Sequence, residues 1–219
     1  MTIAAKALIL DFGGVISKTL FETHAETENA LGLPPGTLKW RGPFDPENDS
    51  LWQSMINDEI SERDYYAIRT REVGQLVGEP WTEMQQFIRA ARASDPSLVL
   101  RTEALQAIET SRQAGRKLAI LSNELDLFYG AEFRHKLHFL KGFDVICDAT
   151  YTKVLKPDPR AYTSCLDELG LTAEECVFVD DQPRNINGAE TVGLRTVLFD
   201  VQNPATGYRQ ALCELGLGD

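Results

Sequence analysis

Short apolar runs, each ended by a polar residue or a glycine, recur along most of the chain. Runs of this kind are typical of the buried strands of a parallel sheet, because such strands need apolar side chains on both faces. Many of their residues are β-branched, which favours strands over buried helical segments. The pattern predicts strands near 7–11, 117–121, 143–147, 176–180 and 195–199.

Helical patterns lie between these strands, and glycines stand where several of the helices should end. Gly115, Gly170 and Gly193 are each placed like the glycine that follows a helix C-terminus. Strands and helices that alternate with short connections predict an α/β fold, in which helices cover both faces of a parallel, Rossmann-like sheet. The predicted helices run over 102–114, 159–169, 186–192 and 208–215.

The segment from Ser17 to Asp95 does not alternate in this way and has the pattern of several helices. Breaks that contain proline or glycine separate these helices, at 34–36, 42–43 and 78–80. Ser61 is placed as the N-cap of one of them. We therefore predict an α/β core made of residues 1–16 and 96–219, with a small α-helical domain inserted at 17–95.

Polar residues stand at the ends of the predicted strands. Asp11 ends the first strand and is followed closely by Gly13 and Gly14, which allow the backbone to turn sharply. The carboxyl ends of parallel strands form the edge at which open α/β sheets bind their ligands. Alone, this stretch is also an ordinary turn. Three further polar pairs follow later in the chain, Ser122–Asn123, Lys156–Pro157 and Asp180–Asp181, and the series predicts a site at this edge.

In their order and spacing, these stretches resemble the motifs of the haloacid dehalogenase superfamily of hydrolases, most of which are magnesium-dependent phosphatases. The matching stretches are Leu10–Ile16, Leu121–Asn123, Lys156–Asp158 and Phe178–Ile186. The resemblance covers nearly the whole chain. It implies that the helical insertion at 17–95 is a cap of the family's first type, which excludes water and selects the substrate. It also implies hydrolysis of a small phosphorylated metabolite.

The resemblance assigns a role to each polar position. Asp11 is the expected nucleophile, since a carboxylate that attacks phosphorus forms an aspartyl-phosphate and divides hydrolysis into two easier steps. Lys156 would balance the negative charge of the aspartate and of the transferring group. Ser122 and Asn123 would donate hydrogen bonds to phosphate oxygens, together with the main chain at Gly14.

Magnesium is the cofactor that the resemblance implies, and Mg²⁺ prefers oxygen ligands. The expected ligands are the Asp11 carboxylate, the main-chain carbonyl of Gly13 and the Asp181 carboxylate. Asp180 would be an alternative ligand or would support the others, and Asn185 stands where another acid often occurs. The other interpretation of adjacent aspartates after a strand is a helix N-cap stabilised by the helix dipole.

Gly13 is the main departure from the family pattern. Phosphatases of the family usually carry a second aspartate at this position, which protonates the leaving group and then activates water. General acid–base help of this kind is typically worth roughly 10²–10⁴-fold in rate. A phosphatase without this acid needs a good leaving group or a proton from the cap, for which His24 and Glu26 are candidates. A branch of the family acting on sugar phosphates looks like this chain, with glycine at the same place.

Two other interpretations of Gly13 stay open. A 2-haloacid dehalogenase-type hydrolase would attack carbon through Asp11, and its halide would leave without a proton. A non-catalytic relic of the fold would bind a ligand without turnover. Dehalogenases of the superfamily need no metal and usually lack paired acids in the fourth motif. Asp180 and Asp181 therefore favour the metal-dependent phosphatase.

Several residues of the inserted segment are candidates for contacting the substrate or its leaving group: His24, Trp40, Arg41, Trp52 and Gln53. Arg41 is the expected substrate-binding residue among them. The alternative is that Trp40 and Trp52 belong to the core of the cap and Arg41 is a surface charge. The superfamily's dehalogenases hold the halide with a cap arginine, but the flanking Gly42–Pro43 does not continue that pattern.

The composition is that of an ordinary globular protein, with 25% charged and 43% hydrophobic residues among 219. The net charge of −11 disfavours nucleic-acid or anionic-membrane partners, because binding a polyanion needs clustered Lys and Arg. No apolar run approaches membrane-spanning length and no signal peptide is visible, which predicts a cytoplasmic protein with a small-molecule substrate. Nothing in the pattern indicates an oligomeric state.

Four cysteines are present, at 147, 165, 176 and 213. They lack the paired spacing of a metal site, and two of them fall inside apolar strands. We expect reduced, buried cysteines.

Overall fold

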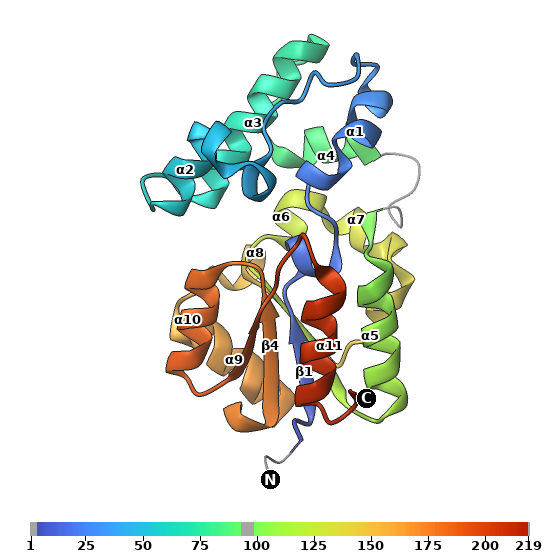
Figure 1. Cartoon of the computed structure of the whole chain (residues 1–219), viewed down its shortest axis with the longest axis vertical. Helices are drawn as coiled ribbons and strands as arrows, with labels where there is room; N and C mark the ends of the chain where they lie inside the picture. The colour runs from blue at the N-terminus through green and yellow to red at the C-terminus, as the bar shows by residue number, and fades with distance from the viewer. Residues whose placement is uncertain (1–3, 93–98, 219) are drawn as a thin grey trace.

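The computed structural model describes residues 4–92 and 99–218. Its lower part is a parallel sheet (Figure 1), which confirms the predicted Rossmann-like α/β fold. The strand order is β3-β2-β1-β4-β5, and every neighbouring pair is parallel. The strands are β1 (Ala7–Leu10), β2 (Lys117–Ser122), β3 (Val145–Asp148), β4 (Cys176–Asp180) and β5 (Arg195–Leu198). Because β1 lies between β2 and β4, the switch point of the sheet is at its carboxyl end, directly before Asp11.

Side chains of successive strand residues alternate between the two faces of the sheet. Leu8 and Leu10 pack on one face, against α5 (Thr102–Gln113) and α11 (Pro204–Glu214). Ile9 packs on the other face, in the same cluster as residues of two further helices. These are α9 (Pro159–Leu169) and α10 (Pro183–Thr191). Both faces are therefore covered, as the continuous apolar strands predict.

Two helices begin earlier than predicted, and both begin at a proline. Helix α10 starts at Pro183 rather than at residue 186, and α11 starts at Pro204 rather than at residue 208. Proline suits the first helical position, because its missing N–H would have no partner there and its φ is already helical. The glycines at 115, 170 and 193 have positive φ, as their predicted positions after helices require.

Short helical elements connect β2 to β3 and β3 to α9. They are α6 (Leu125–Tyr129), α7 (Ala131–Lys136), the 3₁₀ segment η6 (His138–Gly142) and α8 (Ala149–Thr152). Another 3₁₀ turn, η7 (Ala173–Glu175), precedes β4. Helix α6 directly follows β2 and lies under the helical layer at the top of Figure 1. It therefore brings core residues to the cap side of the molecule.

The helical layer above the carboxyl edge of the sheet, here called the cap, consists of described residues between 20 and 92 (Figure 1). Its elements are η2 (Phe21–Thr23), α1 (His24–Leu31), η3 (Gly42–Phe44), η4 (Pro46–Asn48), α2 (Ser50–Ile56), α3 (Glu62–Val77) and α4 (Met84–Arg92). Ser61 caps α3 as expected, and it forms a capping box with Asp64. The predicted boundary at 95–96 lies outside the described residues.

An aromatic cluster forms the centre of the cap. Phe21 makes edge-on contacts with Trp40 and Trp52, at centroid distances of 5.4 and 5.2 Å. Buried Asp49 ties this cluster to α3, because it accepts hydrogen bonds from the Tyr65 hydroxyl and from Arg69. Trp40 and Trp52 are buried, in agreement with the interpretation that they are cap core.

The two connections between cap and core pair with each other. Ser17 forms an antiparallel bridge with Leu100, and Lys18 N–H donates to the Val99 carbonyl at 2.6 Å. Arg101 N–H donates to the Ile16 carbonyl at 3.0 Å. The cap is thus attached through a short two-stranded link next to the turn that follows Asp11.

All four cysteines are free thiols. Cys165 and Cys176 are buried as expected, Cys147 is half-buried, and Cys213 is exposed in the last turn of α11. The expectation of burial is therefore wrong for Cys213, since it lies near the end of the terminal helix. Among the described residues, none of the helices has the length and apolar character needed to cross a bilayer.

Candidate active site

Asp11 is held at the edge of the sheet by a sharp turn. The chain after β1 forms a single π-type turn, η1 (Phe12–Ile16), in which Gly14 has a φ of +73°. A Cβ at Gly14 would also clash with the Asp181 carboxylate, so both the backbone conformation and the close approach require glycine. Apart from Gly13 itself and its two chain neighbours, no described residue has an atom within 4 Å of where a Cβ of Gly13 would be. Lack of space at the Cβ therefore does not account for the missing acid.

Core residues fasten this turn from below. Arg101 Nε donates to the Gly14 carbonyl at 2.9 Å, and the rest of its guanidinium forms a two-pronged ion pair with Glu22. The Tyr208 hydroxyl donates to the Val15 carbonyl at 2.8 Å. These buried contacts fix the backbone next to Asp11, which favours a pre-organised site.

Lys156 links Asp11 to the fourth motif. Its Nζ lies 3.0 Å from Asp11 Oδ1 and 2.6 Å from Asp180 Oδ2, and Asp180 is fully buried. Asp180 also accepts hydrogen bonds from the Asn185 side-chain amide, at 3.0 and 3.1 Å, and from Gln182 N–H at 2.8 Å. Asp180 therefore supports both Lys156 and the start of α10.

Asn123 fastens the loop that carries Lys156. Its Oδ1 accepts from Lys156 N–H at 2.7 Å, and its Nδ2 donates to the Lys156 carbonyl at 3.1 Å. The Asn123 amide group is thus engaged within the protein, and its contribution to a phosphate site would come from the main chain. Ser122 is buried next to it and lines the same pocket.

Negative charge dominates this edge of the sheet. Burial raises the pKa of Asp11 to about 7, against the opposing effect of Lys156. Burial, with Asp180 and Asp11 nearby, holds the pKa of Asp181 well above its usual range. Burial disfavours the charged form of Lys156, but Asp11 and Asp180 outweigh it and raise the pKa of the ammonium. A further cation at this edge would relieve the repulsion between the carboxylates.

The carboxylates are close enough together to share one ion. Oxygen atoms of Asp11, Asp180 and Asp181 all lie within 4.8 Å of one another. A set of hard oxygen donors in excess of nearby positive charge suits Mg²⁺. Because Asp180 is already engaged by Lys156 and Asn185, the geometry favours Asp11 and Asp181 as the principal ligands. The residues present therefore fit the expected metal.

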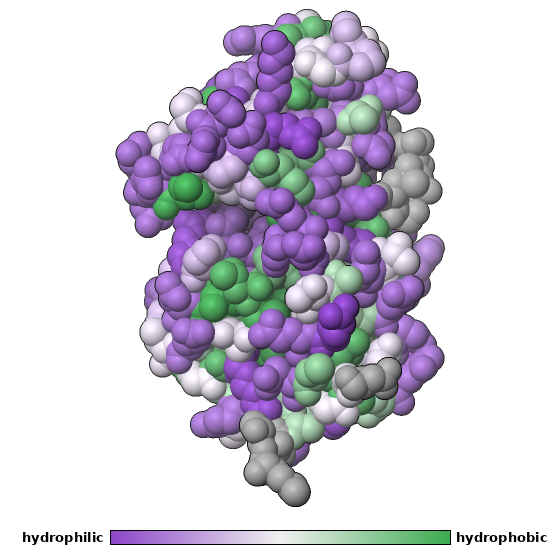
Figure 2. Space-filling view, viewed as in Figure 1, coloured by the Kyte–Doolittle hydropathy of each residue, from purple (hydrophilic) through white to green (hydrophobic). Residues whose placement is uncertain are grey.

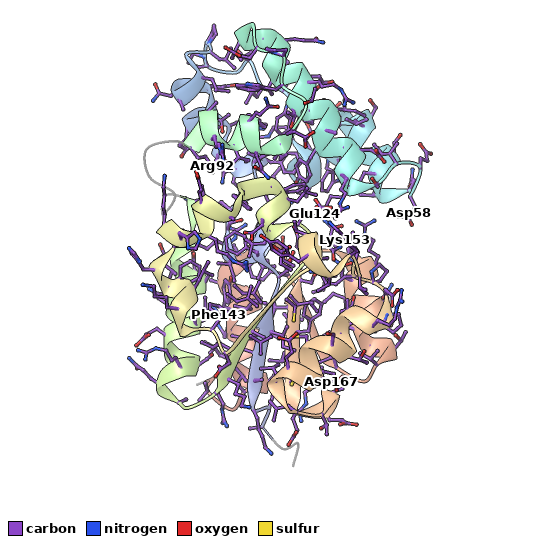
Figure 3. All side chains as sticks on the ribbon, turned by 180° about the vertical axis from the view of Figure 1, so that it is seen from behind. Asp58, Arg92, Glu124, Phe143, Lys153 and Asp167 are labelled. Atoms are coloured by element: carbon purple, nitrogen blue, oxygen red, sulfur yellow. The ribbon has the colours of Figure 1, made fainter. Side chains whose placement is uncertain are left out.

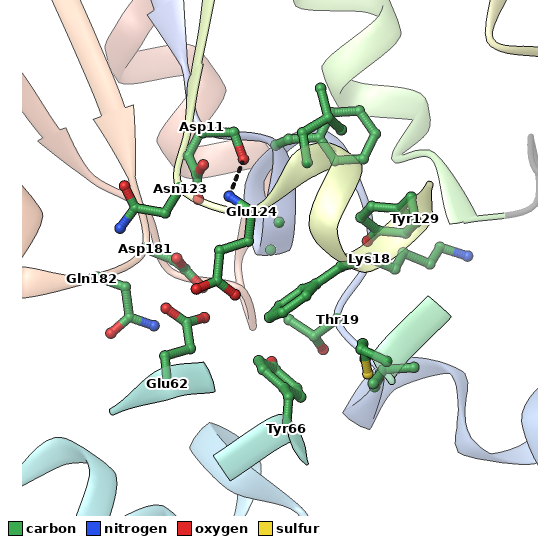
Figure 4. Close-up of a pocket in the computed structure, with 18 of the residues that line it drawn as sticks. Asp11, Lys18, Thr19, Glu62, Tyr66, Asn123, Glu124, Tyr129, Asp181 and Gln182 are labelled. Carbon is green, nitrogen blue, oxygen red and sulfur yellow. Dashed lines mark hydrogen bonds between the residues drawn. The ribbon is translucent and has the colours of Figure 1, made fainter. Parts of the chain in front are cut away.

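Two further acids, not singled out from the sequence, face the same pocket. Figure 4 shows the carboxylates of Glu62, Glu124 and Asp181 turned toward one another below Asp11. Glu62 is the first residue of α3 and comes from the cap, whereas Glu124 follows β2 at the junction of the two layers (Figure 3). Burial raises the pKa of Glu62 to about 7, with Glu124 adding to the effect.

Each of these acids is paired with an arginine on the opposite side of the cleft. Cap residue Arg63 donates to Glu124 Oε1 at 2.7 Å, and core residue Arg184 lies 3.4 Å from Glu62 Oε2. Both pairs join the cap to the core. Glu124 directly follows the second motif and could have been suspected from its position. The role of Glu62 depends on how α3 is oriented over the sheet.

The pocket between the layers holds a cavity of about 80 Å³, several times the space that one water requires. An outer cavity of about 360 Å³ adjoins it and shares Pro43, Trp52, Asp181 and Gln182 with its lining. On the face seen in Figure 2 the surface is largely hydrophilic, with an apolar area below a hollow between cap and core. The half-exposed side chains of Ile56 and Leu198 line this outer cavity.

Comparison with known proteins identifies the family. The family model of haloacid dehalogenase-like hydrolases matches residues 5–193. The chain belongs to this family. The family identification and the fold both agree with the motifs described above, and the protein is accordingly a hydrolase.

The sequence identity to individual relatives is low. The hydrolase is 28% identical over 218 residues to acyl-CoA dehydrogenase family member 10 of Mus musculus, covering 96% of this chain and 19% of that protein. It is 30% identical over 157 residues to the plasmid protein CbbY of Cupriavidus necator, and the match covers 69% of this chain and 56% of that protein. The chain thus spans between about a fifth and somewhat over half of the length of these curated relatives.

Solved structures share the fold of this hydrolase. L-2-haloacid dehalogenase of Xanthobacter autotrophicus has a TM-score of 0.56 at 21% identity, over 89% of this chain and 77% of that one. A haloacid dehalogenase-type phosphatase of Thermococcus onnurineus has a TM-score of 0.55 at 18% identity, over 89% and 86%. At these identities the likeness concerns the fold, and the chemistry must be argued from the site.

The structure of the hydrolase brings most of the predicted site residues together. Among the residues that line the pocket are Asp11, Gly13, Gly14, Ser122, Asn123, Lys156 and Asp181. Asp180 lies immediately beneath them and contacts Lys156. The strand-end rule places the residues that follow β1, β2 and β4 at one edge of the sheet, because the strands are parallel. Lys156 reaches the same edge from the loop between α8 and α9.

Most of the cap residues proposed from the sequence to contact the substrate do not line the pocket. Trp52 lines the pocket, but Arg41 is exposed and does not, and the Gln53 amide donates instead to the Pro46 carbonyl at 2.8 Å. Glu26 is exposed and also lies outside the lining. These positions depend on the packing of the cap helices, which local sequence does not determine.

The position of His24 does not support the suggestion that it donates a proton to the leaving group. It is buried with its ring 4.4 Å from that of Trp40, in an edge-on contact, and it does not line the pocket. Burial lowers its pKa to about 4, with the Arg41 charge adding to the effect. His24 is therefore neutral near pH 7 and belongs to the cap core.

Proposed function

We propose that the hydrolase is a magnesium-dependent phosphatase, which cleaves a small phosphorylated metabolite through an aspartyl-phosphate on Asp11. The observation that carries the proposal is the cluster of three acids within 4.8 Å of one another beside Lys156. Attack on a phosphate monoester brings further negative charge to Asp11, so this chemistry needs a cation, and the cluster could hold one. The proposal includes a cytoplasmic location, from sequence composition alone.

Asp11 would carry the covalent chemistry. An oxygen of its carboxylate attacks phosphorus, and the bond between phosphorus and the leaving oxygen breaks. Water then attacks the same phosphorus, inorganic phosphate departs, and the carboxylate is regenerated. Mg²⁺, held by Asp11, Asp181 and the Gly13 carbonyl, would supply positive charge to the phosphate oxygens.

The surrounding residues would bind and orient the phosphate. Lys156 is placed 3.0 Å from Asp11, so its charge can balance both the nucleophile and the phosphoryl oxygens. The Ser122 hydroxyl and the main-chain N–H groups near Asn123 and Gly14 are the expected hydrogen-bond donors. Asp180 and the Asn123 amide act indirectly, because they hold Lys156 in position.

Glu62 is our candidate for the acid that Gly13 lacks. It enters the pocket from the cap, on the side where a leaving group would lie (Figure 4). A carboxyl with a pKa of about 7 can donate a proton near neutral pH and recover it from water. The proton would pass to the leaving oxygen in the first step, and the resulting carboxylate would activate water in the second.

Two alternative functions use the same site. A 2-haloacid dehalogenase-type hydrolase would attack carbon through Asp11, and a non-catalytic relic would bind phosphate without turnover. Dehalogenation of a neutral carbon needs one carboxylate and a halide site but no metal, and it leaves the Asp181 carboxylate beside Asp11 without a role. The acid cluster is therefore the feature that favours the phosphatase.

A panel of phosphate monoesters and 2-haloacids, each assayed with Mg²⁺ and with excess chelator, tests these alternatives. The phosphatase predicts phosphate release that stops in chelator and returns when Mg²⁺ is restored. Halide release that resists chelation would instead identify a dehalogenase. Phosphate binding by calorimetry without turnover of any compound would identify the relic.

A further inference from the structure

The pocket has one polar end and one apolar wall. The acids and Lys156 lie at the polar end, around Asp11. The wall is made of side chains from the cap and from α6, namely Phe21, Trp52, Tyr66, Met84, Ile88 and Phe128. Figure 4 shows Glu62 and Tyr66, one turn apart on α3, both on the cap side of the pocket, opposite Asp11. A substrate with its phosphorus at Asp11 would therefore direct its leaving group toward the wall.

The apolar wall is continuous across the junction of the two layers. The Tyr66 ring of the cap contacts the Phe128 ring of α6 edge-on at a centroid distance of 5.1 Å. On its other side Tyr66 packs against Tyr65 at 5.3 Å. The wall thus forms when cap and core meet, and it presents mostly ring faces and edges. The Tyr66 hydroxyl is a hydrogen-bonding group on this wall, and it points into the pocket (Figure 4).

Two polar residues that adjoin the wall, Tyr129 and Thr19, already have partners in the protein. The Tyr129 hydroxyl shares a hydrogen bond of 3.0 Å with the Ser17 hydroxyl. Thr19 Oγ1 donates to Glu22 Oε2 at 2.9 Å, and Thr19 N–H donates to the same oxygen at 2.8 Å. The several hydroxyls of a sugar would lose their hydrogen bonds to water here, and on this wall the Tyr66 hydroxyl and the Trp52 indole N–H could replace only part of them.

The charges of the pocket also disfavour a second anionic group. Neither Arg63 nor Arg184 lines the pocket, and the Arg63 guanidinium is engaged by Glu124. Lys18 lines the pocket, but in Figure 4 its ammonium points away from Asp11. A bisphosphate would therefore bring its second phosphate toward acids rather than toward cations.

On the basis of the proposed phosphatase function, we infer that the leaving group is apolar and uncharged. The substrate would be a phosphate monoester of an alkyl or aryl alcohol, with its hydrocarbon part against Tyr66, Ile88 and Phe128. This differs from the sugar phosphate that the family resemblance implies. The polar end binds one phosphate, and the wall selects by burying hydrocarbon.

The test compares primary alkyl phosphates from methyl to hexyl with glucose 6-phosphate, in the presence of Mg²⁺. All of them release a primary alkoxide, so differences in kcat/KM report binding of the leaving group more than its basicity. We expect kcat/KM to rise about threefold for each added methylene over the first few. Glucose 6-phosphate should fall below hexyl phosphate by about tenfold or more.

Variants of wall residues test whether the chain-length dependence of kcat/KM arises from contact with the apolar wall. Tyr66→Ala should lower the hexyl-to-methyl ratio of kcat/KM by about tenfold. Leu76→Ala is the matched control, because Leu76 lies on the same helix, is 52% exposed and is outside the pocket lining. It should keep the parent ratio. If Tyr66→Ala fails to fold, Ile88→Thr, which keeps the β-branch but removes the Cδ1 methyl and adds a hydroxyl, should shift the ratio in the same direction.

The possible results distinguish failure of the inferred leaving-group preference from failure of the proposed phosphatase activity. Magnesium-dependent turnover of glucose 6-phosphate, or of a sugar bisphosphate, above that of hexyl phosphate would overturn the inference and leave the phosphatase intact. A chain-length dependence that Tyr66→Ala and Ile88→Thr both leave unchanged would also overturn it. If none of the esters releases phosphate and 2-haloacids release halide in chelator, the proposed phosphatase fails and the inference falls with it.

Discussion

The two walls of the pocket differ in how they are built. The sheet side presents Asp11, Lys156 and Asp181 from strand ends and tight turns, braced by buried contacts such as that of Arg101 with the Gly14 carbonyl. The cap side presents side chains from helices that pack on their own aromatic cluster. Ion pairs such as Arg63–Glu124 join the two sides.

We attribute the chemistry to the sheet side of the pocket and the selection of the leaving group to the cap side. A nucleophile and its charge partners must be held within a fraction of an ångström, and short loops at the edge of a rigid sheet can do this. A binding wall for a leaving group needs area and shape, which packed helices provide. Glu62 is the exception, because it is a cap residue to which we assign chemistry. The predictions below test this division, from the largest expected effect to the smallest.

Asp11→Asn should lower turnover of every substrate by about 10⁴-fold or more, because an amide is a poor nucleophile of nearly the same shape. The measurement is steady-state phosphate release by the purified variant, with circular dichroism to show that the fold is retained. Substantial residual activity would mean that another group attacks phosphorus.

Metal removal should separate Asp181 from Asp180. Excess chelator should reduce phosphate release to background, reversibly, and Asp181→Asn should raise the Mg²⁺ concentration needed for half-maximal activity. Asp180→Asn should cost about 10–100-fold in activity, as for a group that positions others. Magnesium titration of the parent and both variants measures this. Equal metal requirements in the parent and in Asp181→Asn would remove Asp181 from the metal site.

Glu62→Gln should slow alkyl phosphates by about 10²-fold, because their alkoxides need a proton to leave. Aryl phosphates leave as weaker bases and should be affected much less. Since Glu62 must be protonated for the first step, kcat/KM of alkyl phosphates should fall as pH rises past about 7. This limb of the pH profile should be absent in Glu62→Gln.

Glu26→Gln is the matched control for this prediction, because Glu26 is an exposed cap glutamate outside the pocket lining. It should change neither the leaving-group dependence nor the pH profile. An unchanged pH profile of kcat/KM in Glu62→Gln would mean that Glu62 is not the general acid and that the catalytic groups all lie on the sheet side. Single-turnover rates measured against leaving-group pKa provide the comparison.

His24 should affect stability rather than catalysis. Its folded-state pKa is lowered to about 4, so the unfolded chain binds a proton more readily below the ordinary value of 6.5. The stabilising contribution is therefore complete above pH 6.5 and is lost as pH falls toward 4, by up to about 3 kcal/mol. Denaturant unfolding at pH 7 and pH 4.5 should show a smaller acid loss in His24→Phe than in the parent. An equal loss in both proteins would contradict this account of His24.

The sequence was informative about the sheet side for a physical reason. Parallel strands bury both faces and end at one edge, so Asp11, Ser122 and Asp180 could be placed together without coordinates. Helix α10 begins at Pro183, ahead of the predicted residue 186, because proline suits the first helical position. The Asp181 clash that fixes Gly14 needed coordinates.

The cap side could not be predicted in the same way. Its contacts to the core join residues far apart in the chain, such as Glu62 with Arg184 and Arg63 with Glu124. Their pairing depends on the orientation of α3 over the sheet, which helix periodicity does not encode. The same reason explains why Arg41, expected to bind substrate, and the candidates His24 and Gln53 lie outside the pocket lining.

The central claim is that Asp11 becomes phosphorylated during turnover. The most direct test mixes the enzyme with a phosphate monoester and Mg²⁺, stops the reaction in acid within one turnover, and measures the mass of the peptide that contains Asp11. We predict that this peptide gains one phosphoryl group in the parent and that the corresponding peptide of Asp11→Asn gains none. Phosphate release by the parent without phosphorylation of this peptide at any time in the turnover would contradict the account.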